Sequence, residues 1–140
     1  MKVVVDTNVV ISALLHPARS CGQILNQILD GHITWLITPS ILSEYKEVCL
    51  RPELPISDFH RKWLFEVWNN LPLLPTPPYN CSSVKCSDID DQKFLDAAIY
   101  YRASFLITGN SKHYPKKNVL GVKIITPDKW KESFRNKELN

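Results

Sequence analysis

Acidic side chains that could hold a metal ion lie at three widely separated places in the sequence. Asp6 directly follows the β-branched run Val3–Val5, so it stands at the exit of a predicted buried strand. Glu44 lies among largely apolar residues of a predicted helix, where an acid is costly unless it is paired or binds a cation. Taken alone, a turn or capping role for Asp6 and a solvated position for Glu44 are the simpler interpretations.

The densest acidic group, Asp88–Asp91, begins another predicted helix. The helix macrodipole stabilises carboxylates in the first turn by about 0.3–1 kcal/mol. Asp88 suits the N-cap position, so a structural role is the simpler interpretation for it. Asp91 lies three residues further and can point out of the helix start, whereas Asp96 is expected to face elsewhere on the surface.

Hydrogen-bonding side chains near the predicted strand ends could orient ligands or water: Asn8, Ser12, Thr108 and Asn110. The first two follow Asp6 in what we expect to be a loop. The other two flank Gly109, which permits a tight turn after the predicted strand at 105–107. Because ligands of parallel α/β sheets bind beyond the carboxyl ends of the strands, we expect these acids and amides to converge there.

Convergence of several acids predicts a site for a divalent cation. Their mutual repulsion is relieved by Mg²⁺ or Mn²⁺, which takes oxygen ligands and keeps several waters. Such an ion can lower the pKa of a water and polarise a phosphoryl oxygen. No histidine or cysteine occupies these positions, which favours phosphodiester chemistry over zinc hydrolysis. Cys81 and Cys86 are the only close cysteine pair, and no second pair lies near enough in sequence to complete a zinc site.

The elements that must position these residues alternate between short strands and helices. We expect strands at 3–5, 33–37, 105–107 and 122–125, and helices at 22–30, 39–51, 57–71, 88–102 and 127–134. Thr38-Pro39 and Thr126-Pro127 each place an N-cap before a proline at the first helical position. This order predicts an α/β fold, a three-layer α/β/α sandwich with a mainly parallel central sheet.

Length and composition agree with one globular domain over residues 1–140. About 44% of the residues are hydrophobic and 22% are charged, which excludes disordered and fibrous classes. Four glycines leave no glycine-rich phosphate loop. No apolar run approaches the roughly 20 residues that span a bilayer, and the first one meets an acid too soon for a signal peptide. We therefore expect a cytoplasmic protein without a membrane partner, with its cysteines reduced.

The net charge of +3 is modest, but basic residues gather late in the chain. They include Lys112, His113, Lys116, Lys117 and Lys123. A solvated basic face is the simpler interpretation. A polyanionic partner is the alternative, with Lys112, Lys116 and Lys117 contacting the backbone of an RNA.

Four motifs, in this order, resemble those of the PIN domain, a small α/β ribonuclease fold found in toxin–antitoxin modules. The matching pieces span nearly the whole chain: Val4–Val9 with Ser12, Thr38–Ser40 with Leu42 and Glu44, Asp88–Asp91 with Phe94-Leu95, and Leu106–Asn110. The resemblance is to VapC-like ribonucleases. Each motif alone is weak, but four in order at these spacings are fairly specific.

The resemblance implies metal-dependent RNA cleavage with Asp6, Glu44 and Asp91 as the acidic core and Asp88 as an additional metal ligand. It also implies Mg²⁺ or Mn²⁺ as cofactor, homodimers, and a cognate antitoxin that blocks the site, often with a basic side chain. Many family members carry an aspartate where this chain has Asn110. A neutral amide there can still bond a metal-bound water, but it removes one charge and leaves the number of metal ions open.

The leading hypothesis is therefore a Mg²⁺-dependent endoribonuclease, whose late lysines attract RNA in a salt-sensitive manner. The alternative is a catalytically silent module that binds RNA or a protein, motivated by Asn110 and the modest net charge. A third possibility is a phosphatase with Asp6 as nucleophile. Such enzymes usually need a second acid two residues further, where this chain has Asn8.

Overall fold

The computed structural model describes the backbone of residues 1–78 and 81–139, and side chains as far as residue 135. Residues 79, 80 and 140 of the predicted domain lie outside the described residues. Among the described residues, none of the helices combines the length and apolar character that crossing a membrane requires.

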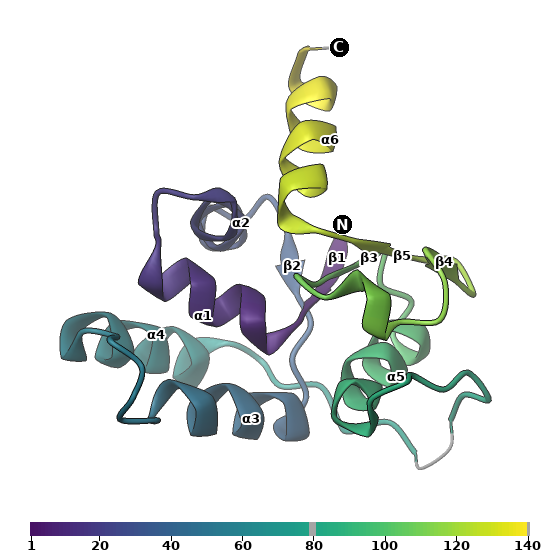
Figure 1. The fold of residues 1–140 in the computed structure, drawn as a ribbon, viewed down its shortest axis with the longest axis horizontal. Coiled ribbons are helices and arrows are strands. Elements are labelled where there is room, and N and C mark those ends of the chain that lie inside the picture. Colours follow the sequence, from purple (N-terminus) through teal and green to yellow (C-terminus); the bar gives the residue numbers. More distant parts are fainter. Residues whose placement is uncertain (79–80, 140) are drawn as a thin grey trace.

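The centre of the molecule is a sheet that has five strands within the described residues, in the order β2-β1-β3-β5-β4 (Figure 1). The strands are β1 (Lys2–Val5), β2 (Thr34–Trp35), β3 (Phe105–Ile107), β4 (Asn118–Val119) and β5 (Val122–Ile125). The pairs β1–β2, β1–β3 and β3–β5 are parallel, and β4 is antiparallel to β5. The mainly parallel sheet is confirmed. The strand predicted at 33–37 is shorter than expected, and β4 was not predicted.

Helices cover both faces of the sheet (Figure 1). On one face lie α3 (Pro39–Cys49), α4 (Asp58–Asn70) and α5 (Gln92–Tyr100), and on the other lie α2 (Ser20–Leu29) and α6 (Pro127–Leu139). Helix α1 (Thr7–Leu15) contacts both α2 and α3 beside the β2 edge. The three-layer α/β/α sandwich is therefore confirmed.

Local sequence accounts for the start of most elements. Val3, Val4 and Val5 are almost fully buried, as expected of a parallel strand covered on both faces. The Thr38 hydroxyl accepts a hydrogen bond from the backbone N–H of Ile41, which satisfies one of the free donors of the first turn of α3. Thr126 caps α6 in the same way.

Two boundary predictions are wrong. Helix α1 begins directly after Asp6, so Asn8 and Ser12 are helical rather than in a loop. Asp6 is itself the extended N-cap residue, and the apolar stretch after it buries its side chains as a helix. The helix expected at 88–102 is divided, because a 3-10 turn, Ile89–Asp91, precedes α5.

An aromatic group joins α3, α4 and α5 to the end of β1. The rings of Trp35, Tyr45, Trp68 and Phe94 are buried and contact one another around Tyr45. The Tyr45 hydroxyl donates a hydrogen bond to the carbonyl oxygen of Val5. The core thus holds the strand residue that immediately precedes Asp6.

Candidate active site

Asp6 lies at the carboxyl end of β1 and is only 5% exposed. Its Oδ2 accepts hydrogen bonds from the Thr108 hydroxyl at 2.8 Å and the Tyr114 hydroxyl at 3.2 Å. Burial raises the pKa of Asp6, and the negative charge of Asp91 raises it further, against the opposing effect of these hydrogen bonds. The carboxylate is held in one orientation at the edge where β1 and β3 both end.

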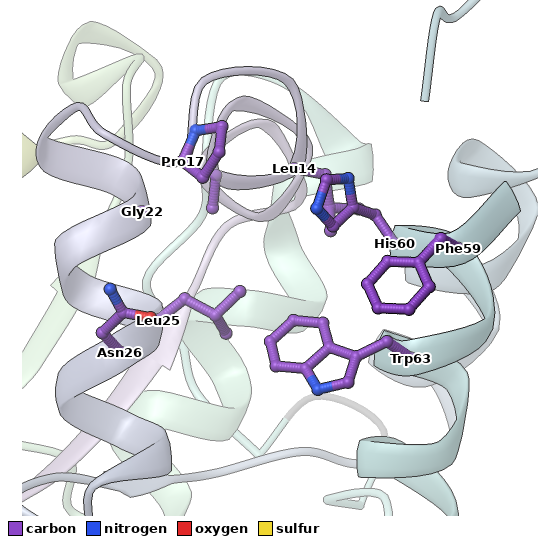
Figure 2. A pocket seen from close by; sticks show the side chains of 9 residues that line it. Leu14, Pro17, Gly22, Leu25, Asn26, Phe59, His60 and Trp63 are labelled. Atoms are coloured by element: carbon purple, nitrogen blue, oxygen red, sulfur yellow. The ribbon is translucent and has the colours of Figure 1, made fainter. Parts of the chain in front are cut away.

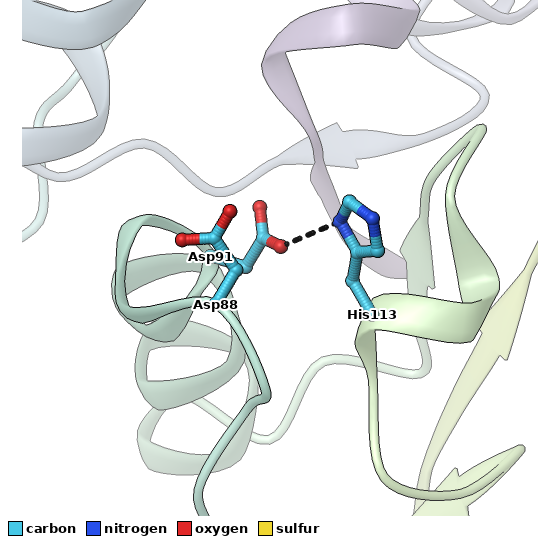
Figure 3. Close-up of side chains that lie close together, drawn as sticks. All are labelled: Asp88, Asp91 and His113. Carbon is cyan, nitrogen blue, oxygen red and sulfur yellow. Dashed lines mark hydrogen bonds and ion pairs between the residues drawn. The ribbon is translucent and has the colours of Figure 1, made fainter.

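Asp91 is the last residue of the 3-10 turn before α5, and its side chain is half-buried. One carboxylate oxygen, Oδ2, lies 3.1 Å from Nδ1 of His113 (Figure 3). Burial raises the pKa of Asp91, the negative charges of Asp88 and Glu44 add to the rise, and His113 opposes it. Asp91 therefore lies in a field that other carboxylates make negative.

Asp88 caps the 3-10 turn, as predicted for the start of this element. Its Oδ1 accepts a hydrogen bond from the backbone N–H of Asp90 at 2.9 Å. Asp88, Asp91 and His113 each also offer one ligand atom to a common space, and these atoms all lie within 4.8 Å of one another (Figure 3). A capping role and a ligand role are thus compatible for Asp88, because a carboxylate has two oxygens.

Glu44 is half-buried on α3 rather than solvated. Its Oε2 accepts a hydrogen bond from the Thr7 hydroxyl, and its Oε1 forms an ion pair with Nζ of Lys93 at 2.7 Å. Lys93 lies two residues beyond Asp91 in the chain. Glu44 is therefore paired with a lysine, which is one of the two conditions under which an acid among apolar residues is tolerated.

The Cys86 thiol shows that the carboxylates act on the same region. Burial is the largest reason that its pKa rises to about 12. Four negative charges add to the rise, in decreasing order Asp91, Asp96, Asp6 and Asp88. Acids from the end of β1 and the start of α5 therefore share one electrostatic environment.

Asp96, which was expected to face elsewhere than Asp91, adds to the negative charge around Cys86. It is half-buried and accepts a hydrogen bond from the Gln92 side chain at 2.8 Å. With Cys86 and Lys93 it lines a hollow of about 680 Å³. The helical turn that separates Asp96 from Gln92 places it beside the loop before Asp88, which sequence spacing alone did not indicate.

Three of the four predicted supporting residues surround the exit of β3. The Asn8 side-chain oxygen accepts a hydrogen bond from the backbone N–H of Gly109 at 3.2 Å. The Thr108 hydroxyl, which donates to Asp6, also accepts a hydrogen bond from the backbone N–H of Asn110 at 3.0 Å. Gly109 does not adopt a positive φ, so the turn does not depend on the conformational freedom of glycine.

Ser12 contacts α2. Its hydroxyl hydrogen-bonds to the sulfur of Cys21, and it lines a separate hollow with His16 and Asp128. Ser12 follows Asn8 by one turn of α1.

His113 is the residue of the acidic group that sequence analysis missed. It was counted only as part of the late basic cluster, although it follows Asn110 by three residues. The statement that no histidine occupies the site is therefore wrong. A short 3-10 turn, Ser111–His113, brings the imidazole back toward Asp91, and no periodicity in the sequence announces such a short turn.

The PIN domain family model matches residues 2–112 of the chain. The chain belongs to the PIN domain family. It is 33% identical to the uncharacterized protein MJ1680 of Methanocaldococcus jannaschii, over 96% of this chain and 92% of that protein. The fold is also that of a chain in the crystal structure of VapBC2 from Rickettsia felis bound to a DNA fragment from their promoter. That match has a TM-score of 0.62 at 14% identity and covers 90% of this chain and 98% of that one.

The lysines predicted to contact RNA follow the acidic site of this PIN domain in sequence. Lys112 lies in the 3-10 turn beside His113, and Lys116 and Lys117 lie in the segment before β4. All three are exposed. They can therefore meet a polyanion without first losing a buried partner.

A second surface feature of the PIN domain is apolar. A cavity of about 290 Å³ lies between the α1–α2 region and α4 (Figure 2). Leu14 and Leu25 line it from one side, and Phe59 and Trp63 line it from α4. Phe59, which lines this cavity from α4, is 76% exposed.

Proposed function

We propose that this PIN domain is an endoribonuclease that depends on a divalent metal ion. One observation carries the proposal. Asp6 and Asp91 come from distant parts of the chain, meet at the carboxyl end of a parallel sheet, and each raises its pKa through burial and a neighbouring carboxylate. Active sites are where such unfavourable groupings of acids are tolerated, because the bound cation and substrate compensate them.

The donor set fits Mg²⁺ or Mn²⁺. Asp6, Asp91, Asp88 and Glu44 would hold the ion through carboxylate oxygens, the ligands these cations prefer. A divalent cation there supplies a water of lowered pKa and polarises a phosphoryl oxygen. Burial is the main reason that the pKa of Asp91 is raised, and the charges of Asp88 and Glu44 add to it; a bound cation would offset these charges.

The other residues of the chain would prepare this site. Thr108 and Tyr114 orient the Asp6 carboxylate through their hydroxyl groups. Asn8 accepts a hydrogen bond from the backbone N–H of Gly109, and the amide of the neighbouring Asn110 would bond a water molecule. Lys112, Lys116 and Lys117 would attract the RNA backbone.

Cleavage of a labelled RNA tests the proposal. We expect activity with Mg²⁺ or Mn²⁺, none with EDTA, and loss of activity in Asp6→Asn and Asp91→Asn. The matched control is Asp30→Asn, an exposed acid at the end of α2 and the opposite edge of the sheet, which should retain activity. Cleavage that persists in EDTA and in Asp6→Asn would contradict the proposed mechanism.

Two observations favour a second candidate, a catalytically silent module that binds RNA or protein. Lys93 already neutralises Glu44, and Asn110 lacks the carboxylate that many relatives carry. Titration calorimetry with Mn²⁺ separates the two functions. A folded protein without Mn²⁺ binding and without cleavage supports the silent module, whereas binding that Asp91→Asn abolishes supports the nuclease.

We further propose that the protein is the toxin of a toxin–antitoxin pair. The shared fold with a chain of the VapBC2 complex supports a protein partner, and the apolar groove of Leu25, Phe59 and Trp63 suits an apolar segment of an antitoxin. Expression should arrest growth, and co-expression of the product of an adjacent reading frame should restore it. Phe59→Ser should prevent this rescue but keep the arrest, while Leu50→Ser, an exposed apolar control, should leave both unchanged.

We also propose that this toxin is a homodimer and that it acts in the cytoplasm, where its RNA substrate would be. Light scattering at micromolar concentration should give about twice the 16.1 kDa mass of the chain. A monomer at all concentrations tested would exclude the dimer without affecting the proposed chemistry.

A further inference from the structure

The acidic site contains one ligand type that does not suit a purely hard cation. His113 Nδ1 lies 3.1 Å from Asp91 Oδ2, and the imidazole shares a space within 4.8 Å with both Asp88 and Asp91 (Figure 3). The His113 side chain is 45% exposed, so an ion from solvent can reach it. The grouping is therefore two carboxylates and an imidazole rather than carboxylates alone.

The position of His113 follows from the turn that begins at Asn110. The backbone N–H of Asn110 donates a hydrogen bond to the Thr108 hydroxyl, and Asn110 directly precedes the 3-10 turn that carries His113. The backbone N–H of His113 in turn donates to the Asn110 carbonyl at 3.0 Å. The segment from Asn110 to His113 thus carries an amide instead of a carboxylate at Asn110, and its imidazole, at His113, points toward the acids.

We infer that His113 supplies a nitrogen ligand to the metal ion of this site and makes the site favour Mn²⁺ over Mg²⁺. The inference rests on the metal-dependent function proposed above and specifies its ion. Mg²⁺ requires oxygen ligands in near-ideal octahedral geometry, whereas imidazole suits transition metals. A site with one imidazole and one carboxylate fewer therefore loses more affinity for Mg²⁺ than for Mn²⁺.

A different role for His113 is a counter-ion that only neutralises Asp91. The two roles differ in what surrounds the metal. A ligand places a nitrogen nucleus in direct contact with the ion, and a counter-ion does not. Nitrogen coupling to bound Mn²⁺ is therefore a readout that does not depend on RNA cleavage.

Pulsed electron paramagnetic resonance of the Mn²⁺ complex tests the inference. We expect nitrogen coupling in the unmodified protein and in His16→Asn, a control in an exposed histidine after α1, but not in His113→Asn. Circular dichroism checks that each variant is folded. Coupling that survives in His113→Asn, or that is missing from the unmodified protein with Mn²⁺ bound, would overturn the inference.

Calorimetric affinities for both ions give a second test. His113→Asn should weaken Mn²⁺ binding at least about tenfold, the lower limit for losing even an outer-shell partner of a metal site, with a smaller effect on Mg²⁺. His113→Asp should restore an all-oxygen set and shift the preference toward Mg²⁺. Equal losses for both ions would contradict the role of His113 in metal choice.

These outcomes separate the inference from the proposed function. If Mn²⁺ binds and supports RNA cleavage without nitrogen coupling, His113 is not a ligand and the nuclease stands. If Mn²⁺ does not bind at all, both fail.

Discussion

At the scale of single residues, the Asp6 carboxylate is a buried acid with a fixed orientation. It is fixed by two hydroxyl donors, Thr108 and Tyr114, and by its backbone N–H, which donates to the carbonyl of Ile107. These bonds hold a negative charge at a position where burial opposes it. The orientation of the Asp6 carboxylate is thus fixed, but its buried charge destabilises the metal-free protein.

This conflict predicts an unusual pH dependence. Because the pKa of Asp6 is raised above its ordinary value of 3.8, the folded protein holds the proton more tightly than the unfolded chain does. The metal-free protein should therefore lose stability as pH rises from about 3.8 through the higher folded-state pKa, by about 1.4 kcal/mol for each tenfold difference in proton affinity.

Asp6→Asn should remove part of this slope and make the metal-free protein more stable at neutral pH. Asp91, whose pKa is also raised, accounts for a remaining part. Urea unfolding in EDTA between pH 3.5 and 7 measures both effects, with Asp30→Asn as control. Stability that instead increases with pH through this range would show that the hydrogen bonds to Asp6 outweigh its burial.

The ion pair between Lys93 and Glu44 gives a second prediction at this scale. Lys93→Met keeps much of the side-chain stem but removes the charge that neutralises Glu44. Mn²⁺ affinity should rise, because Glu44 becomes available to a cation, while stability should fall by less than about 1 kcal/mol since the pair is partly exposed. Calorimetry measures the affinity, and Lys129→Met, an exposed lysine on α6, should leave it unchanged. Weaker Mn²⁺ binding in Lys93→Met would mean that Lys93 supports the site.

At the scale of elements, the site depends on how closely the helices approach one another and the sheet. Tyr45 on α3 binds the Val5 carbonyl, so α3 helps to fix the end of β1. Gly22, the third residue of α2, lies directly against the backbone of Pro17, in the connection from α1. A Cβ atom at Gly22 would lie 1.9 Å from the Pro17 carbonyl oxygen, which no rotamer can relieve.

Gly22→Ala should therefore destabilise the protein by roughly 1–3 kcal/mol, the usual cost of overpacking. The matched control is Gly109→Ala, where the added Cβ would lie at an ordinary 3.5 Å from the Asn8 side chain and φ is not positive. Urea unfolding of both variants gives the comparison. Equal stabilities would show that the α1–α2 connection moves to accept the methyl group.

At the scale of the whole molecule, charge is distributed unevenly. The acids meet at the carboxyl edge of the sheet, while the exposed lysines follow Asn110 in the chain, although the net charge is only +3. A nuclease needs both, since the acids that hold a cation also repel RNA. The late lysines would offset that repulsion.

Replacing Lys112, Lys116 and Lys117 by glutamine should weaken RNA binding at low salt. It should also reduce the slope of log affinity against log salt by up to about 2, at roughly 0.7 for each lost phosphate contact in a single strand. Fluorescence anisotropy with catalytically impaired Asp91→Asn as background measures both. The same replacements at exposed Lys2, Lys62 and Lys129 are the control, and an equal change there would indicate only a net-charge effect.

Much of the architecture follows from local sequence. The β-branched run before Asp6, the Thr-Pro caps of α3 and α6, and the alternation of strands and helices predict a parallel α/β sandwich, because propensity, capping and burial act within a few residues. The capping role of Asp88 was predicted for the same reason. Short elements such as β4 and the 3-10 turns were not predicted, because two or three residues carry no periodic signal.

The sequence also indicated which residues belong to the site, but not all of the contacts between their side chains. Residue types and motif order indicate which acids and amides belong to the carboxyl edge of the sheet, and Asp6, Asp91 and Thr108 do meet there. Only the tertiary structure assigned Lys93 to Glu44, His113 to Asp91 and Asp96 to the neighbourhood of Cys86. Such contacts join side chains from separate elements, and their geometry depends on how those elements pack rather than on any spacing along the chain.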